Sequence, residues 1–238
     1  MNVGLIGYGK MGQLVEATIN KQDDMKLVQI IEMDDFSKLN NCKEHVDVLI
    51  DFSHPNNLEQ LVSYVRKHHT PVVIGTTGYN EEQIKEIHKL KDYAPVIFTA
   101  NFSLGITVFA KVLQYITPIL KDNFDIEIVE AHHNQKVDAP SGTAKLLLSC
   151  CNPDKEYKEV FHRPEKGKRG KEIGIHSIRG GNVAGEHTVM FLGEDEIFEI
   201  KHKAESKQIF VNGAIVAARF ATKQSNGLYT MEDVLFQK

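Results

Sequence analysis

The sequence has few cysteines, no excess of charge of one sign and no apolar run long enough to span a membrane. Its 238 residues include three cysteines and carry a formal net charge of −4. A membrane-spanning helix needs roughly 20 apolar residues in succession. A nucleic-acid-binding or membrane-binding surface is usually marked by an excess of basic residues. The sequence therefore predicts neither a nucleic-acid partner nor a membrane partner.

The three cysteines, Cys42, Cys150 and Cys151, form neither a disulfide framework nor a Cys/His spacing typical of a zinc site. We predict no metal site, and we interpret Cys150 and Cys151 as small apolar side chains buried on a helix. An apolar strand pattern begins almost at Met1, which leaves no room for a charged leader and a cleavage site. The expectation that follows is a reducing, cytoplasmic location.

The remaining composition is that of an ordinary globular protein. Hydrophobic residues make up 42% of the chain and charged residues 25%, which is enough apolar material for a core of normal size. A chain of this length can form two modest domains or one large domain.

Short apolar runs alternate with helical patterns in the first hundred residues. This alternation predicts βαβ units and an α/β fold, in which helices cover both faces of a parallel sheet. The expected strands cover residues 1–6, 27–31, 46–53, 71–78 and 95–102, and the expected helices cover about 13–19, 56–69 and 81–90.

The pattern changes after Phe102. A long apolar helix over 104–120 is followed by a strand over 124–131 and a helix over about 143–151. Glycine-rich turns then separate three runs that we predict to be antiparallel strands joined by hairpins, over 173–180, 186–192 and 197–203. A closing helix over about 207–223 returns the chain to the first domain. The predicted domains are 1–102 plus 212–238, and an inserted α+β mixed-sheet domain over 103–211.

The stretch 152–172 is rich in basic residues and shows no periodic spacing of apolar residues, so we interpret it as an exposed, solvated loop. Acidic residues are interleaved and no aromatic stacking platform accompanies them, which argues against nucleic-acid binding. Its basic residues are Lys155, Lys158, Arg163, Lys166, Lys168, Arg169 and Lys171.

A G-x-G-x-x-G motif follows the first expected strand and precedes a helical pattern, with the acidic Glu32 about 20 residues further on. Gly7 allows the tight turn, Gly9 lets the backbone approach a pyrophosphate, and Gly12 lets the helix pack on the strand. The carboxylate of Glu32 can accept hydrogen bonds from a ribose. This context predicts a Rossmann-type dinucleotide-binding domain; the alternative is a turn that needs glycine for its geometry alone.

Two further polar segments, Gly75-Thr76-Thr77 and Ala100-Asn101-Phe102, lie at carboxyl ends of expected parallel strands. Ligands of such sheets bind in the crevice outside these ends. Small polar residues there can hydrogen-bond a nicotinamide ribose or carboxamide, although ordinary loop chemistry explains them equally well.

The run EAHHNQKVDAPSGT, residues 130–143, combines two histidines, a lysine and the start of a helix. His132 and His133 are adjacent, so on an extended backbone they point to opposite sides. Ser141 is placed to be an N-cap that leaves the N–H groups of Gly142 and Thr143 free to bind an anion. Alone, the histidine pair is more typical of a structural feature; beside this helix start and Lys136, it indicates a site for a substrate carboxylate.

Together these motifs closely resemble the family of 4-hydroxy-tetrahydrodipicolinate (dihydrodipicolinate) reductases. The resemblance covers essentially the whole chain and includes GYGKMG at 7–12, DFS at 51–53, GTTG at 75–78, ANFSLG at 100–105, the run 130–143, GGNVAGEHTVMF from residue 181 and NGA at 212–214. It implies an enzyme of lysine and diaminopimelate biosynthesis that uses NADH or NADPH. It also implies a homotetramer built through the sheet of the inserted domain.

The resemblance also implies roles for individual residues. His132 would be the proton donor or acceptor and Lys136 a proton donor, with His133, Lys136, Ser141, Gly142 and Thr143 binding the substrate. The residues that would hold the cofactor are Gly7, Tyr8, Gly9, Lys10, Met11, Gly12, Glu32, Gly75, Thr76, Thr77, Thr99, Ala100, Asn101 and Phe102.

The chain departs from the family pattern in two places. Many members carry arginine directly after the acidic residue, where it meets a 2′-phosphate; this chain has Met33, although Lys10 could still reach that phosphate. The stretch between Glu32 and Val46 is also shorter than is usual in the family. These departures leave open the choice between NADH and NADPH. The sequence also does not determine whether the hydroxylated substrate loses water on the enzyme, or how far the two domains close on binding.

Our hypothesis is hydride transfer from a reduced nicotinamide to an unsaturated ring that bears two carboxylates. The alternatives are another nicotinamide-dependent amino-acid or sugar dehydrogenase, or a non-catalytic redox sensor that binds NADH. The run 130–143 argues against both, because a sensor needs no imidazole and ammonium beside an anion site.

Overall fold

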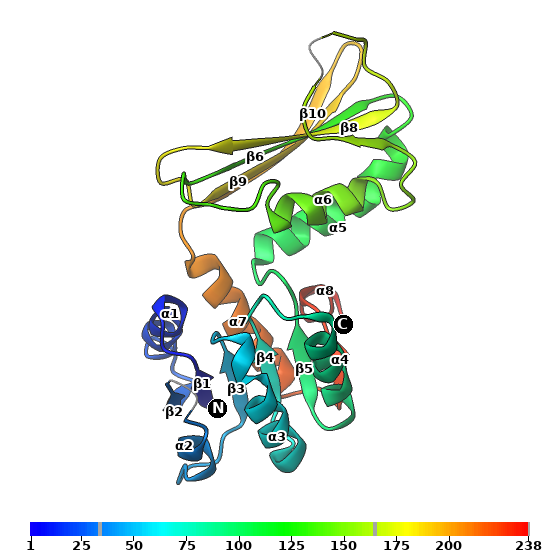
Figure 1. Ribbon diagram of the computed structural model, residues 1–238. Coiled ribbons are helices and arrows are strands. Elements are labelled where there is room, and N and C mark those ends of the chain that lie inside the picture. The colour runs from blue at the N-terminus through cyan, green and yellow to red at the C-terminus, as the bar shows by residue number, and fades with distance from the viewer. Residues whose placement is uncertain (33–34, 164–165, 238) are drawn as a thin grey trace. The chain divides into compact units, whose positions relative to one another are not determined.

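The computed structural model describes residues 1–32, 35–163 and 166–237, and its chain divides into two compact units. Unit 1 comprises Met1–Leu104 and Gln208–Lys238, and unit 2 comprises Gly105–Lys207. The sequence placed these divisions at 102 and 212. Figure 1 labels most of the helices and strands of the two units.

Unit 1 contains a six-stranded parallel sheet with the order β11-β5-β4-β3-β1-β2. Its strands are β1 (Asn2–Ile6), β2 (Lys26–Ile31), β3 (Val48–Asp51), β4 (Val72–Ile74), β5 (Pro95–Phe98) and β11 (Gly227–Tyr229). The central strands are buried on both faces, which explains why they are continuous apolar runs without alternation. The predicted Rossmann-type parallel sheet is confirmed.

Helices cover both faces of this sheet, which therefore separates two layers of the core. In one layer, Leu5 and Ile50 pack against Val15 and Ala217. On the opposite face, Leu49 packs against α3 (Leu58–His68) and α4 (Glu81–Lys89). The helices of this unit are α1 (Lys10–Ile19), α2 (Ser37–Asn40), α3 (Leu58–His68), α4 (Glu81–Lys89), α7 (Gln208–Ala221) and α8 (Met231–Phe236), with short 3₁₀ turns at Pro55–Asn57 and Leu90–Asp92.

Unit 2 contains a five-stranded mixed sheet with the order β10-β9-β6-β8-β7. Its strands are β6 (Asp125–His132), β7 (Lys158–Val160), β8 (Glu172–Arg179), β9 (Gly185–Leu192) and β10 (Ile197–Ala204). Helices α5 (Leu104–Leu120) and α6 (Gly142–Cys151) pack on this sheet through Leu113 and Leu147, which join a core with Ile128 and Phe191.

The predicted hairpin between β9 and β10 is confirmed, but the one predicted between β8 and β9 is wrong. β6 lies between these strands, antiparallel to β9 and parallel to β8. The pairing places Gly174 beside the carboxylate of Glu127, where a Cβ would come within 1.8 Å of Oε2. It also places Arg179 beside Glu130. Charged side chains on β6 therefore meet partners that the local pattern of β8 and β9 does not reveal.

The interpretation of residues 152–172 as a merely solvated loop is also wrong. Arg163 pairs with Glu127 and Glu172, and Arg169 donates to Asp125 at 2.8 Å and to the backbone oxygen of Ile126 at 3.1 Å. The short strand β7, parallel to β8, lies within this stretch. Because Glu127 is nearly buried, the arginines compensate its charge rather than form a basic surface.

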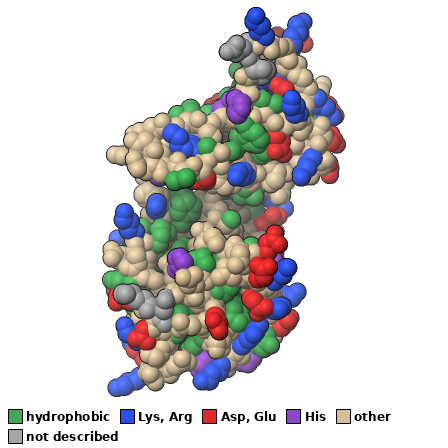
Figure 2. Space-filling model, viewed as in Figure 1, with side chains coloured by type: hydrophobic (Ala, Val, Ile, Leu, Met, Phe, Trp, Pro, Cys, Tyr) green, Lys and Arg blue, Asp and Glu red, His purple; other side chains and the backbone are tan. Residues whose placement is uncertain are grey.

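Acidic and basic side chains are interspersed over the face that Figure 2 shows, in keeping with the small net charge. Over the described part of the chain, the structure contains no helix with both the length and the apolarity to cross a membrane. Within the same residues, His, Cys, Asp and Glu side chains do not gather in threes in a way that could hold a metal ion.

Candidate active site

The glycine loop joins β1 to α1 in unit 1. Gly7 has φ +88°, and a Cβ on it would lie 2.3 Å from the backbone oxygen of Phe52. A Cβ on Gly12 would lie 2.1 Å from the oxygen of Gly7. The first and third glycines are therefore required by the fold itself.

Gly9 differs from these two because the protein leaves it open. A Cβ on Gly9 would meet no atom within 4 Å, and as N-cap of α1 this residue offers no side-chain oxygen to the first amides of the helix. An open backbone at an uncapped helix start suits a pyrophosphate, which accepts hydrogen bonds from those amides. The loop therefore fits the dinucleotide that the sequence predicts.

Tyr8 in this loop, Lys10 at the start of α1 and Glu32 directly after β2 are also predicted to contact the cofactor. Lys10 and Glu32 are exposed, and Tyr8 is half-buried with its hydroxyl donated to Glu16. That hydrogen bond raises the pKa of Tyr8. Met33, which stands where many family members have arginine, lies outside the described residues.

A hollow of about 390 Å³ lies at the carboxyl ends of β3 and β4. Met11 of the glycine loop and the predicted Gly75, Thr76 and Thr77 all line it, so the fold brings two of the sequence-predicted groups together. A Cβ on Gly75 would lie 2.2 Å from the ring of Phe52, which explains the glycine at this position.

The four residues of the third predicted group, Thr99 to Phe102, differ in their exposure to solvent. The Phe102 side chain is buried in the core of unit 1, with its ring edge-on to Phe52 at 6.2 Å between centroids. Ala100 is exposed, and Thr99 and Asn101 are half-buried and hydrogen-bonded to each other. The side chain of Phe102 therefore has a structural role in the core.

Sequence reasoning missed a role for Asp51, at the end of β3. Its carboxyl is buried, accepts from the Ser53 hydroxyl at 2.5 Å and lies 3.3 Å from the Tyr79 hydroxyl. Burial raises the pKa of Asp51. The network joins the loop after β3 to the loop after β4 and so shapes the hollow. An acidic residue inside an apolar strand is the signal that could have identified it.

The second group of predicted residues lies in unit 2 and is organised around Glu130 of β6. This side chain is fully buried and accepts two hydrogen bonds from Arg179, at 2.7 and 2.8 Å, and one from the backbone of Ser141 at 3.2 Å. Burial opposes ionisation, but the hydrogen bonds from Arg179, Ser177 and His132 outweigh it and lower the pKa of Glu130 to about 2. Glu130 is therefore a carboxylate at any working pH.

His132 ends β6 with its ring held by this carboxylate. Nδ1 lies 2.5 Å from Glu130, and the side chain is only 10% exposed. Burial lowers the pKa of His132, and the cations of Lys136 and Arg179 add to this, against the opposing effect of Glu130. The adjacent His133 is half-buried. With Nδ1 held by an anion, the other ring nitrogen of His132 is the one that can exchange a proton with a ligand.

Ser141 is the N-cap of α6, as predicted, and accepts from the Ala144 amide at 3.1 Å. Its hydroxyl also lies 3.0 Å from Nε2 of His187, whose ring is edge-on to His132 at 5.1 Å. Burial lowers the pKa of His187 to about 4, with His132 adding to the effect. Sequence reasoning missed His187 because β9 supplies it from 46 residues further along the chain.

At the predicted anion site beside the start of α6, Lys136 already has a partner in the chain. Nζ of Lys136 lies 2.7 Å from the Asp138 carboxylate. The hydrogen bond to Lys136 is the main cause that lowers the pKa of Asp138. Lys136 is therefore already paired with an anion that belongs to the chain itself.

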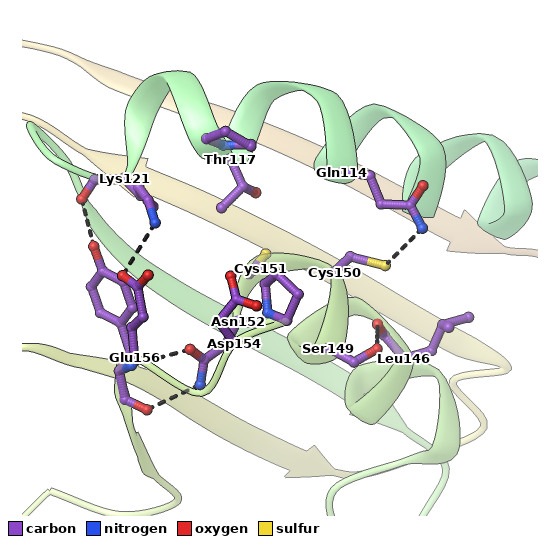
Figure 3. A pocket seen from close by; sticks show the side chains of 13 residues that line it. Gln114, Thr117, Lys121, Leu146, Ser149, Cys150, Cys151, Asn152, Asp154 and Glu156 are labelled. Atoms are coloured by element: carbon purple, nitrogen blue, oxygen red, sulfur yellow. Dashed lines mark hydrogen bonds and ion pairs between the residues drawn. The ribbon is translucent and has the colours of Figure 1, made fainter.

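A separate hollow of about 510 Å³ lies between α5 and α6, and Figure 3 shows the residues that line it. Cys150 and Cys151 are buried beside it, and burial raises the pKa of the Cys151 thiol to about 12. Their burial on α6 confirms their interpretation as small buried side chains. None of the predicted site residues lines this hollow.

The two groups of residues have complementary chemistry. Unit 1 offers an open helix start and a hollow at the carboxyl ends of parallel strands. Unit 2 offers an imidazole held by a buried carboxylate, near an ammonium and a second helix start. The first suits a dinucleotide, and the second suits an anionic ligand that exchanges a proton.

Comparisons with known proteins identify relatives over the whole chain. Residues 1–102 match the model of the N-terminal domain of dihydrodipicolinate reductase, and residues 105–235 match the model of its C-terminal domain. The chain is 42% identical over 241 residues to the 4-hydroxy-tetrahydrodipicolinate reductase of Clostridium novyi, which covers 97% of this chain and 96% of the relative. It is also 42% identical to the enzyme of the same name from Brachyspira hyodysenteriae, over 99% of this chain and 100% of the relative.

A solved structure shows the same fold. Dihydrodipicolinate reductase from Paenisporosarcina sp. TG-14, which was determined with dipicolinate bound, superimposes with a TM-score of 0.77 at 25% identity over 99% of this chain and 100% of that one. Matches to both domain models and full-length identity above 40% lead to one conclusion: this chain belongs to the dihydrodipicolinate reductase family.

Proposed function

We propose that this protein is a 4-hydroxy-tetrahydrodipicolinate reductase, which transfers a hydride from NADH or NADPH to a dihydrodipicolinate-type ring and yields tetrahydrodipicolinate. The observation that carries the proposal is the network that Arg179 and His132 form around the buried Glu130, beside Lys136 and the start of α6. This arrangement combines proton donors with groups that bind carboxylates, and reduction of a ring dicarboxylate needs both.

The reduced nicotinamide would supply the hydride. In unit 1, the open backbone at Gly9 and the start of α1 would hold the pyrophosphate, with Glu32 on the ribose. The hollow lined by Met11 and Thr76 would take the nicotinamide side. The full set of cofactor contacts that we propose is Gly7 to Gly12, Glu32, Gly75 to Thr77 and Thr99 to Phe102, with Phe102 contributing backbone rather than side chain.

In unit 2, the substrate's carboxylates would meet Lys136 and the amides at the start of α6. His133, Ser141, Gly142 and Thr143 would complete the contacts, with Ser141 positioned by His187. Protonation of the reduced ring would come from His132 or Lys136. A positioned acid contributes roughly 10²- to 10⁴-fold to such a step.

Two expectations from the sequence remain predictions about the cellular form of the enzyme. One is a homotetramer built through the sheet of unit 2, and the other is a cytoplasmic location. Size-exclusion chromatography with light scattering tests the first, since a tetramer would have about four times the chain mass of 26.8 kDa.

Pyridine-2,6-dicarboxylate, a planar dianion, is expected to inhibit by competing with the substrate. It presents two carboxylates on one ring but cannot accept the hydride productively, so it should occupy the site in unit 2 without turnover. Steady-state kinetics at several inhibitor concentrations, with NADH held constant, measure the pattern. A dehydrogenase for amino acids or sugars would ignore this compound, and a redox sensor would show no turnover at all.

Replacing Gly9 by alanine is expected to weaken NADH binding about tenfold or more, because the added methyl would occupy the space proposed for the pyrophosphate. The thermal midpoint should stay unchanged, since a Cβ there meets no protein atom and φ is −76°. Calorimetric titration with NADH measures the affinity. Gly170→Ala is the matched control, because a Cβ at Gly170 also meets no atom within 4 Å. Gly167 is unsuitable as a control, because its φ of +136° would strain an alanine. Unchanged affinity in Gly9→Ala would contradict this placement.

A further inference from the structure

The site proposed for the substrate's carboxylate already contains a carboxylate of the chain. Asp138 lies 2.7 Å from Nζ of Lys136. Lys136 is one of the groups that the proposed function assigns to the substrate. In this structure its partner is therefore chemically the same group that the ligand would bring.

The backbone of Asp138 is firmly held, whereas its side chain is not. Arg179, fixed by its two bonds to Glu130, also donates to the backbone oxygen of Asp138 at 2.7 Å. The Asp138 side chain is 53% exposed and the Lys136 side chain 22%. An ion pair this open to water contributes little to stability, so a rotation about the side-chain bonds can break it at small cost.

The charges around Asp138 are arranged so that one anion is favoured and a second is not. Among the described residues, Lys136 and Arg179 are the cations near Asp138, and Arg179 is already paired with Glu130. His132 lies in the field of both cations and is paired with the same Glu130. Of these two described cations, Lys136 is therefore the one left for a ligand, and Asp138 already pairs with it.

We propose that Asp138 is a displaceable internal carboxylate that holds Lys136 until a substrate carboxylate replaces it. The inference rests on the proposed function and concerns specificity at that same site. A ligand with one carboxylate only exchanges one acceptor of Lys136 for another and gains little. A ligand with two carboxylates makes the same exchange and adds contacts elsewhere at the site. Asp138 thus raises the threshold for binding, which the additional contacts of a dicarboxylate allow it to exceed.

The test is calorimetric titration, in the presence of NADH, with pyridine-2,6-dicarboxylate and with pyridine-2-carboxylate. We expect Asp138→Asn to bind both compounds about three- to tenfold more tightly than wild type, because the competing charge is gone while the shape is kept. The gain should be about the same for the two compounds, because both displace the same carboxylate. Asp138→Ala should behave in the same way, which guards against a misfolded asparagine variant. Asp195→Asn, in the turn between β9 and β10, is the matched control and should bind as wild type does.

A double-mutant cycle identifies the partner. In a Lys136→Ala background, the effect of Asp138→Asn should shrink to less than about twofold, because the ion pair that it removes no longer exists. Unchanged or weaker binding by both Asp138 variants would overturn the inference while leaving the proposed function intact. If wild type bound neither compound, or Lys136→Ala bound them as tightly as wild type, the proposed function itself would fail.

Discussion

Replacing His132 by glutamine or Lys136 by alanine is expected to lower turnover at least about tenfold while NADH binds as before. Glutamine keeps a polar group near Glu130 but cannot carry an imidazole proton, and alanine removes the ammonium that meets the substrate carboxylate. Because the proposed dinucleotide contacts lie in unit 1, neither change should alter NADH affinity. Initial rates and calorimetric titration with NADH measure the two quantities.

Suitable controls for this experiment are His45→Gln and Lys85→Ala, which change exposed side chains of unit 1 outside the proposed site. Both should retain wild-type rates. Turnover within a few-fold of wild type in His132→Gln and in Lys136→Ala would refute the proposed proton donors.

The dependence of kcat/KM on pH separates the two candidate acids. Burial lowers the pKa of His132 in the free protein. If His132 is the acid, it must be protonated, so kcat/KM should fall as pH rises through a value below the ordinary 6.5 or so of histidine. If Lys136 is the acid, no such fall should occur in that range. In His132→Gln, any fall that belongs to the imidazole disappears.

Replacing Arg179 by methionine is expected to lower the free energy of unfolding by about 3–5 kcal/mol at neutral pH. Methionine keeps much of the apolar stem, but it leaves the fully buried Glu130 without the partner that donates its two hydrogen bonds. Urea denaturation followed by circular dichroism measures the loss. Arg219→Met, which breaks an open ion pair with Asp24, should cost far less.

The pH dependence of this loss follows from the ionisation of Glu130. Its pKa is about 2 in the folded protein, below the ordinary value of 4.5, so its ionised form contributes stability above pH 4.5 that is lost as pH falls toward 2. Without Arg179, the folded-state pKa should rise, and this contribution should shrink or reverse. The variant should therefore be less destabilised, relative to wild type, near pH 4 than near pH 7.

A second variant shows whether the unpaired charge is the cause. Glu130→Gln combined with Arg179→Met should be more stable than Arg179→Met alone, because it leaves no buried charge without a partner. A double variant as unstable as the sum of both single variants would instead indicate that the two residues act independently.

Local sequence was sufficient for the elements that begin and end on local signals. The turn at Gly7, the helix after Gly12 and the cap at Ser141 all depend on residues within a few positions of one another. The parallel strands of unit 1 were predictable for the same reason, since burial on both faces requires continuous apolar runs. Both halves of the proposed site could therefore be located along the chain from local patterns alone.

The tertiary structure decided which charges meet. Glu130 and Arg179 are 49 residues apart and become neighbours only because β6 lies between β8 and β9. His187 reaches Ser141 through the same strand order. Periodicity records which face of a strand is buried, but the order of strands in a sheet depends on long-range pairing of buried groups. Local patterns carry no information about that pairing.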